Sequence, residues 1–240
     1  MAKGKFAVFD IDGTLVRWQL YHAIADALAR QGHIEAVDYQ QMREARLDWK
    51  RRSGSSFEQY QAVVIKTYES ILGSLTADEL SVAINEVFAE YKDQVYTYTR
   101  DLIAELKRKN YKLFAISGSQ VEIVAKIAEY YDFDDYLGTV YERKGKGFSG
   151  KKEVVAFYKD QALQLLIDRN AVGLKSSVAV GDGVSDAAML KMVEHPIAFN
   201  PERELFELAK KSDWLVVVER KNIVYELEKK NGKYQLVKAG

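Results

Sequence analysis

The chain has 240 residues and carries 35 lysines and arginines against 35 aspartates and glutamates, so its formal charge is zero. This balance argues against a protein that coats nucleic acid or an anionic membrane through bulk charge. Because the chain has no cysteine, disulfides, thiolate nucleophiles and zinc–thiolate sites are excluded as well.

The first predicted element is a short strand at residues 5–10, where the sequence reads KFAVFD. These residues are mostly apolar and β-prone, and a polar turn from Asp10 to Thr14 follows them. A short apolar run that stops at a polar turn is typical of a strand buried in a parallel sheet. We therefore expect this segment to be a buried parallel strand.

Residues 16–95 have the pattern of helices and contain no convincing strand. The expected helices cover residues 20–28, 37–51, 57–72 and 77–91. Two of them begin with a capping box, in which a hydroxyl residue and an acid three positions later satisfy backbone amides: Ser55 with Glu58, and Thr76 with Glu79. This stretch is therefore predicted to be an all-helical insert.

From residue 96 onward, predicted helices and strands alternate. The expected strands cover residues 112–116, 136–141, 177–180, 197–199 and 214–218, and the expected helices residues 100–109, 120–131, 159–169, 185–192 and 202–211. One hairpin is expected near residues 138–152 and another near 223–237. Alternating strands and helices indicate an α/β fold, with a Rossmann-like parallel sheet that carries helices on both faces.

Acidic residues follow two of the predicted strands. Asp10 and Asp12 come directly after the first strand, and Asp182 and Asp186 follow the strand at residues 177–180. In a parallel α/β sheet the functional site lies beyond the carboxyl ends of the strands. Carboxylates are costly to bury unpaired, and a divalent cation such as Mg²⁺, which prefers oxygen ligands, would offset that cost.

A third strand end supplies groups that suit a phosphate. The predicted strand at residues 112–116 is followed by Ser117, Gly118 and Ser119, which lead into a predicted helix. A hydroxyl together with backbone N–H groups at the start of a helix forms a phosphate cradle. Acids, a hydroxyl and amide donors at three strand ends point to phosphoryl transfer on a magnesium ion.

The strings DIDGT, ISGS and GDGVSD resemble, in this order, three motifs of the haloacid dehalogenase superfamily of phosphohydrolases. The helical insert after the first motif resembles the C1 cap of the phosphoserine-phosphatase-like branch. The resemblance implies a catalytic core at residues 1–15 and 96–240 and a cap at residues 16–95. It also implies a Mg²⁺-dependent phosphomonoesterase whose cap closes over a small phosphorylated metabolite.

The resemblance assigns a role to each acid. Asp10 would attack phosphorus and form an aspartyl-phosphate. Asp12 would protonate the leaving oxygen and then deprotonate water, and its backbone carbonyl would bind the metal. Asp10 and Asp182 would be direct carboxylate ligands of Mg²⁺. Asp186 would not bind the metal itself but would hold its ligands in place.

The same resemblance assigns the phosphate-binding groups to Ser117, the Gly118 N–H and a lysine. Three lysines compete for that last role. Lys159 opens the helix that leads to the strand before Asp182, as in relatives that have this hairpin, whereas Lys151 and Lys152 fall where the hairpin is expected. Lys159 is the favoured choice.

Three residues are candidates to contact the part of the substrate beyond the phosphate. Arg17 and Trp18 follow the first motif into the cap, and Arg51 lies in a basic cluster that also fits a solvated helix end. Phosphoserine phosphatases usually place a glutamate soon after the first motif to bind the substrate amine. Here the stretch reads VRWQLYH and no acid occurs before Asp26, which counts against an amino-acid substrate.

Two other functions use similar residues. A phosphotransferase would pass the same aspartyl-phosphate to an acceptor other than water. A receiver-like signalling module also uses acids, Mg²⁺, a hydroxyl and a lysine, but receivers are far shorter and have no cap. The start of the chain lacks a signal-peptide pattern, and no stretch reaches the roughly 18 apolar residues of a membrane span, so a cytoplasmic protein is expected.

Overall fold

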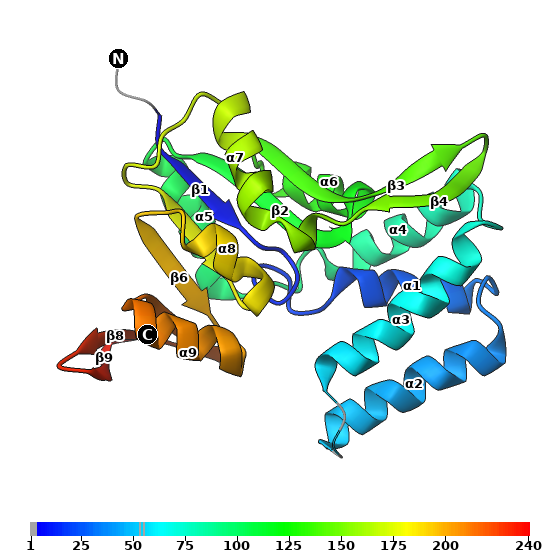
Figure 1. Ribbon diagram of the computed structural model, residues 1–240, viewed down its shortest axis with the longest axis horizontal. Coiled ribbons are helices and arrows are strands. Elements are labelled where there is room, and N and C mark those ends of the chain that lie inside the picture. The colour runs from blue at the N-terminus through cyan, green and yellow to red at the C-terminus, as the bar shows by residue number, and fades with distance from the viewer. Residues whose placement is uncertain (1–3, 53, 55) are drawn as a thin grey trace. The chain divides into compact units, whose positions relative to one another are not determined.

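The computed structural model describes residues 4–52, 54 and 56–240. These residues form two compact units (Figure 1). The sheet unit consists of the chain up to Trp18, Lys92–Thr139 and Val154–Gly240. The helical unit consists of Gln19–Tyr91 and Val140–Glu153, so it includes the hairpin that the sequence analysis assigned to the catalytic core.

In the described part of the chain, nine strands form a sheet in the order β4-β3-β2-β1-β5-β6-β7-β8-β9. They are β1 (Phe6–Phe9), β2 (Lys112–Gln120), β3 (Asp135–Lys144), β4 (Gly147–Glu153), β5 (Val178–Gly181), β6 (His195–Phe199), β7 (Leu215–Arg220), β8 (Ile223–Lys230) and β9 (Lys233–Ala239). The six central strands, in the order β3, β2, β1, β5, β6 and β7, pair in parallel. The strand β4 at one end and the strands β8 and β9 at the other end are joined by antiparallel pairs. The predicted α/β fold with a parallel sheet is confirmed.

Helices cover both faces of the sheet unit (Figure 1). They are α5 (Thr97–Arg108), α6 (Val121–Tyr130), α7 (Lys159–Arg169), α8 (Ala187–Leu190) and α9 (Arg203–Ser212). The strand β1 is buried throughout, as predicted. Because alternate residues of a strand point to opposite faces, Phe6 and Val8 pack with Leu163 of α7 and Met189 of α8, whereas the Phe9 ring meets Phe133 on the other face.

The helical unit contains the four predicted helices, α1 (Leu20–Arg30), α2 (Ala36–Arg51), α3 (Phe57–Leu72) and α4 (Ala77–Tyr91). The predicted capping box at Thr76 is confirmed, because Thr76 N–H donates to Glu79 at 2.8 Å and Glu79 N–H donates to the Thr76 hydroxyl at 3.2 Å. At α3 the box forms from Ser56 and Gln59 instead. The predicted cap, Ser55, lies outside the described residues.

The β3–β4 hairpin contacts the helices of its own unit. Lys152 of β4 pairs with Glu69 of α3, and the Ala77 amide donates to the Lys146 carbonyl at 2.7 Å. The second hairpin, β8–β9, extends the other end of the sheet. There the Tyr234 hydroxyl donates to the Trp214 carbonyl at 2.8 Å, which fixes the predicted hairpin to the sheet unit.

No helix in the described ranges is both long enough and apolar enough to cross a membrane.

Burial of His22 predicts a loss of stability in acid. This α1 side chain is fully buried, and its ring lies 4.6 Å from that of Tyr60. Burial, aided by the charge of Arg46, lowers the pKa of His22 from 6.5 to about 3. The unfolded chain therefore binds a proton that the folded protein excludes, so the stabilisation is complete above about pH 6.5 and is lost as the pH falls.

We expect His22 to account for about 2 kcal/mol of unfolding free energy lost between about pH 7 and about pH 5. Urea unfolding at the two pH values measures this loss. His22→Gln should lose less stability over that interval than the wild type, and the control His195→Gln, at an exposed position, should match the wild type. Equal losses in all three proteins would contradict the assignment.

Candidate active site

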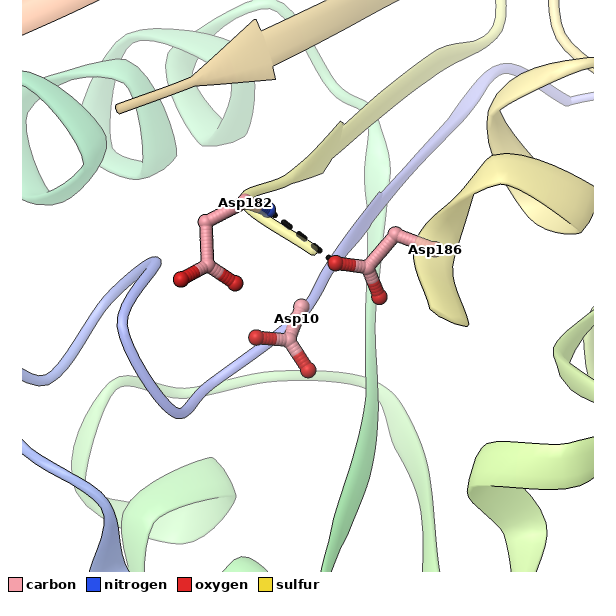
Figure 2. Close-up of side chains that lie close together, drawn as sticks. All are labelled: Asp10, Asp182 and Asp186. Carbon is pink, nitrogen blue, oxygen red and sulfur yellow. Dashed lines mark hydrogen bonds between the residues drawn. The ribbon is translucent and has the colours of Figure 1, made fainter. Parts of the chain in front are cut away.

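The carboxylates of Asp10, Asp182 and Asp186 point toward one another at the carboxyl ends of β1 and β5 (Figure 2). Each offers an oxygen that lies within 4.8 Å of the other two. The Asp10 amide donates to the Val180 carbonyl at 3.0 Å, so the pairing of β1 with β5 continues to the first acid. The adjacent strands thereby bring together residues that lie far apart in the sequence.

Lys159, the first residue of α7, enters this cluster. Its Nζ lies 2.7 Å from Asp10 Oδ1 and 2.5 Å from Asp186 Oδ1, and only 2% of the side chain is exposed. Of the two competing lysines, Lys152 pairs with Glu69 in the helical unit and Lys151 is exposed on β4. The structure thus brings Lys159, the favoured lysine, to the acids.

The cluster holds more negative charge than its one ammonium group can offset. Burial raises the pKa of Asp10 to about 7 against the attraction of Lys159. Burial and the repulsion of Asp10 and Asp186 raise the pKa of Asp182 well above its usual value. Burial opposes protonation of Lys159, but the two carboxylates that it contacts outweigh that effect and raise its pKa.

Clustered carboxylate oxygens from two buried residues and the partly buried Asp182, with a deficit of positive charge, fit a hard divalent cation such as Mg²⁺. The backbone around Asp182 lies close to the carboxylates of the cluster. Asp186 Oδ2 accepts the amides of Asp182 at 3.0 Å and Gly183 at 3.1 Å, which leaves Asp182 to face the cluster (Figure 2). Gly13 has a φ of +82°, and a Cβ there would lie 2.2 Å from Asp182 Oδ2.

The Asp12 side chain lies apart from that group of acids and is held by two serines. Ser117 Oγ donates to Asp12 Oδ2 at 2.5 Å, and Ser119 Oγ donates to Asp12 Oδ1 at 3.0 Å. Sequence reasoning assigned a role to Ser117 but missed Ser119. The sequence did contain a signal for Ser119, because two serines that are two residues apart place both hydroxyls on one side of an extended chain.

The strand that carries Ser117 is longer than predicted. Instead of ending at Ile116, β2 continues to Gln120 and bulges between these two residues. The Ser119 amide donates to Ser117 Oγ at 2.9 Å within this bulge. The expected loop is therefore an irregular part of the strand, and α6 begins at Val121.

Of the three residues expected to contact the rest of the substrate, two lie in the sheet unit and one lies in the helical unit. Arg17 pairs with the buried Glu219, and its guanidinium lies 5.0 Å from the Tyr96 ring centroid. Trp18 is partly buried where the first segment of the sheet unit ends. Arg51 is exposed as the last residue of α2 in the helical unit.

Sequence reasoning also missed the role of Glu219. Its carboxylate accepts the amides of Thr97 at 3.2 Å and Tyr98 at 2.9 Å, at the start of α5. Because the first amides of a helix lack partners within the helix, this acid caps α5 and fixes Arg17 at the same time.

The sequence matches the family of haloacid dehalogenase-like hydrolases over residues 7–191. It is 24% identical over 222 residues to a phosphoserine phosphatase of Wolinella succinogenes, an alignment that covers 91% of this chain and 96% of that protein. It is 22% identical over 225 residues to a histidinol-phosphatase of Neisseria meningitidis, covering 88% of this chain and 97% of that protein.

Solved structures share the fold. A Bordetella pertussis protein of unknown function superposes with a TM-score of 0.72 at 20% identity, covering 90% of this chain and 98% of that one. A substrate-bound phosphoserine phosphatase superposes with a TM-score of 0.64 at 23% identity, covering 92% and 96%. At these identities the similarity establishes the architecture alone.

Proposed function

The chain belongs to the haloacid dehalogenase-like hydrolases, and on that basis we propose that it is a Mg²⁺-dependent phosphomonoesterase that acts on a small phosphorylated metabolite. One observation carries the proposal. A buried carboxylate, Asp10, lies 2.7 Å from the buried Lys159 ammonium, and Asp12, two residues further on, is held by two hydroxyls. In the proposed mechanism these three groups would serve as the nucleophile, the cation and the oriented acid–base group.

In the proposed reaction an Asp10 oxygen attacks phosphorus, and the bond from phosphorus to the leaving oxygen breaks. Asp12 enters this step protonated and gives its proton to the leaving oxygen. In the second step Asp12 takes a proton from water, and that water attacks phosphorus and releases Asp10. The hydrogen bond from Ser119 would keep the Asp12 carboxyl group in one orientation through both steps, whereas Ser117 would turn its single hydroxyl hydrogen from Asp12 to the phosphoryl group when substrate binds.

The transferred phosphoryl group carries negative charge that must be matched. Ser117, the Gly118 N–H and Lys159 would bind its outer oxygens, and Lys159 already contacts the nucleophile. Asp10, Asp182 and the Asp12 backbone carbonyl would hold Mg²⁺. The bound ion would supply the charge that offsets repulsion between the Asp10 carboxylate and an anionic substrate.

The names of the relatives point to amino-acid-derived phosphates, but this chain lacks one feature for such substrates. No acid occurs between Asp12 and Asp26, and Asp26 pairs with Arg46 at 2.7 Å inside the helical unit. We therefore propose that the substrate's leaving group does not have an amine that depends on an acid in this segment for binding. A panel of phosphorylated metabolites tests this point, and phosphoserine as the best substrate by kcat/KM would contradict it.

Metal removal tests the magnesium requirement. We expect chelation to reduce hydrolysis of 4-nitrophenyl phosphate to background, and Mg²⁺ to restore it. Added Mg²⁺ should also raise the melting temperature of the wild type, because it offsets repulsion among the buried acids. Asp182→Asn should lose most of that shift, and Asp168→Asn, on the exposed face of α7, should keep it. Full activity in chelator would contradict the proposal.

Assaying with an excess of alcohol separates hydrolysis from phosphotransfer. A phosphatase releases one inorganic phosphate for each nitrophenol. A phosphotransferase would release fewer phosphates than nitrophenols and would form an alkyl phosphate.

A further inference from the structure

The pairing of β2 with β3 is interrupted where the phosphate-binding residues lie. Ile116 pairs with Leu137 and Gln120 pairs with Thr139, so the three residues 117–119 of β2 stand opposite Gly138 alone. Such a bulge takes backbone groups out of the ladder and re-aims side chains. The backbone polar groups of the bulge then need other partners, because buried ones are costly to leave unpaired.

Thr139 supplies one of these partners. Its buried hydroxyl donates to the Gly118 carbonyl at 2.7 Å. Close approach of the two strands makes this contact possible, since a Cβ at Gly138 would lie 3.0 Å from the Ser119 carbonyl oxygen and 2.8 Å from Val121 Cα. A side-chain hydrogen bond thus takes the place of a ladder bond in the bulge.

The contact continues into the site through one peptide group. The Gly118 carbonyl and the Ser119 N–H belong to the same planar unit, so fixing one end fixes the other. The Ser119 N–H donates to Ser117 Oγ at 2.9 Å, and Ser117 Oγ donates to Asp12 Oδ2 at 2.5 Å. A continuous chain of hydrogen bonds therefore runs from Thr139 to Asp12.

We propose that Thr139 is a positioning residue for phosphate binding. This inference rests on the proposed function, in which Ser117 and the Gly118 N–H bind the phosphate. Its hydroxyl holds the peptide between Gly118 and Ser119, and that peptide directs the Ser117 hydroxyl. Without the hydroxyl the bulge can rotate, and the donors that bind phosphate lose their alignment. Buried hydrogen-bonded networks of this kind hold a site in one geometry only while each member is satisfied.

Thr139→Val removes the hydroxyl and keeps the shape of the side chain, whereas Thr139→Ser keeps the hydroxyl. With Mg²⁺ present, we expect the valine variant to bind inorganic phosphate, as a competitive inhibitor, about tenfold more weakly than the wild type and to show a similar rise in KM for 4-nitrophenyl phosphate. The serine variant should stay within about twofold. Inhibition constants and KM do not depend on the fraction of folded enzyme, so a loss of stability alone would not move them.

Ser177→Ala is the matched control. Ser177 is also buried and donates to a backbone carbonyl, that of Leu174 at 2.5 Å, but it precedes β5 at the opposite end from Asp182. This variant should lose stability and keep the wild-type constants. If Thr139→Val does not fold, Thr139→Ala against Thr139→Ser makes the same comparison.

Unchanged phosphate affinity in the hydroxyl-lacking variants would overturn the inference, as would equal losses in the serine and valine variants. A wild-type protein with no phosphatase activity and no phosphate binding would instead show that the proposed function had failed. The two failures are thus distinguished by the wild type alone.

Discussion

Asp10→Asn is expected to reduce kcat for 4-nitrophenyl phosphate by about 10⁴-fold or more, because a carboxamide cannot act as the nucleophile. The protein should nevertheless fold. The substitution keeps the size of the side chain and removes one of three negative charges that lie close together in a buried site. Stopped assays at high protein concentration measure the residual rate, and circular dichroism checks the fold.

Stability gives a second readout of the same variant. Because burial raises the pKa of Asp10 from 3.8 to about 7, the folded protein keeps a proton that the unfolded chain releases, so stability falls as the pH rises through this range and the full loss is present above about pH 7. In chelator at about pH 8, Asp10→Asn should therefore melt at the wild-type temperature or higher. Asp168→Asn, at an exposed position on α7, should retain full activity. Substantial turnover by Asp10→Asn would remove Asp10 from the mechanism.

Lys159→Met is expected to lower kcat/KM by about 10²-fold to 10³-fold and also to destabilise the protein. Two carboxylates, Asp10 and Asp186, lose the ammonium group that contacts them at 2.7 and 2.5 Å. Breaking a buried ion pair from one side costs about 3–5 kcal/mol, because the remaining charges stay buried. Urea unfolding and steady-state kinetics measure the two effects.

Lys152→Met is the matched control, since Lys152 also pairs with a carboxylate, that of Glu69, but is 35% exposed. Exposed pairs contribute about 1 kcal/mol or less, so this variant should differ little from the wild type. Adding Asp186→Asn to Lys159→Met should recover stability without recovering activity. A larger loss of activity in Lys152→Met than in Lys159→Met would move the phosphate-binding lysine to the hairpin.

Local patterns were sufficient to predict most of the fold. The apolar run of β1, the helical periodicity of α2, α3 and α4, and the capping box at Thr76 each depend on residues close in sequence. Motif residues could be placed at one edge because parallel strands align their carboxyl ends. The gathering of Asp10 and Asp182 follows from that rule, whereas Lys159, at the start of α7, was chosen from the family resemblance.

Features that depend on long-range pairing could not be read in this way. The bulge in β2 requires the register with β3, and the Thr139 contact exists only because Gly138 lets the strands approach. Arg17 was named as a candidate substrate contact, but its pairing with Glu219, 202 positions away in the sequence, could not be read from the local pattern. The β3–β4 hairpin was recognisable as a hairpin, but its membership of the helical unit depends on contacts such as that of Lys152 with Glu69.

Trapping a phosphoryl group on Asp10 tests the central claim most directly. In Asp12→Asn the first step should still proceed with 4-nitrophenyl phosphate, whose leaving group needs no protonation, but the second step loses its general base. Rapid acid quench followed by peptide mass spectrometry should therefore find one phosphoryl group on Asp10. Nitrophenol release without a phosphorylated Asp10, or a phosphoryl group on Ser117 instead, would contradict the mechanism.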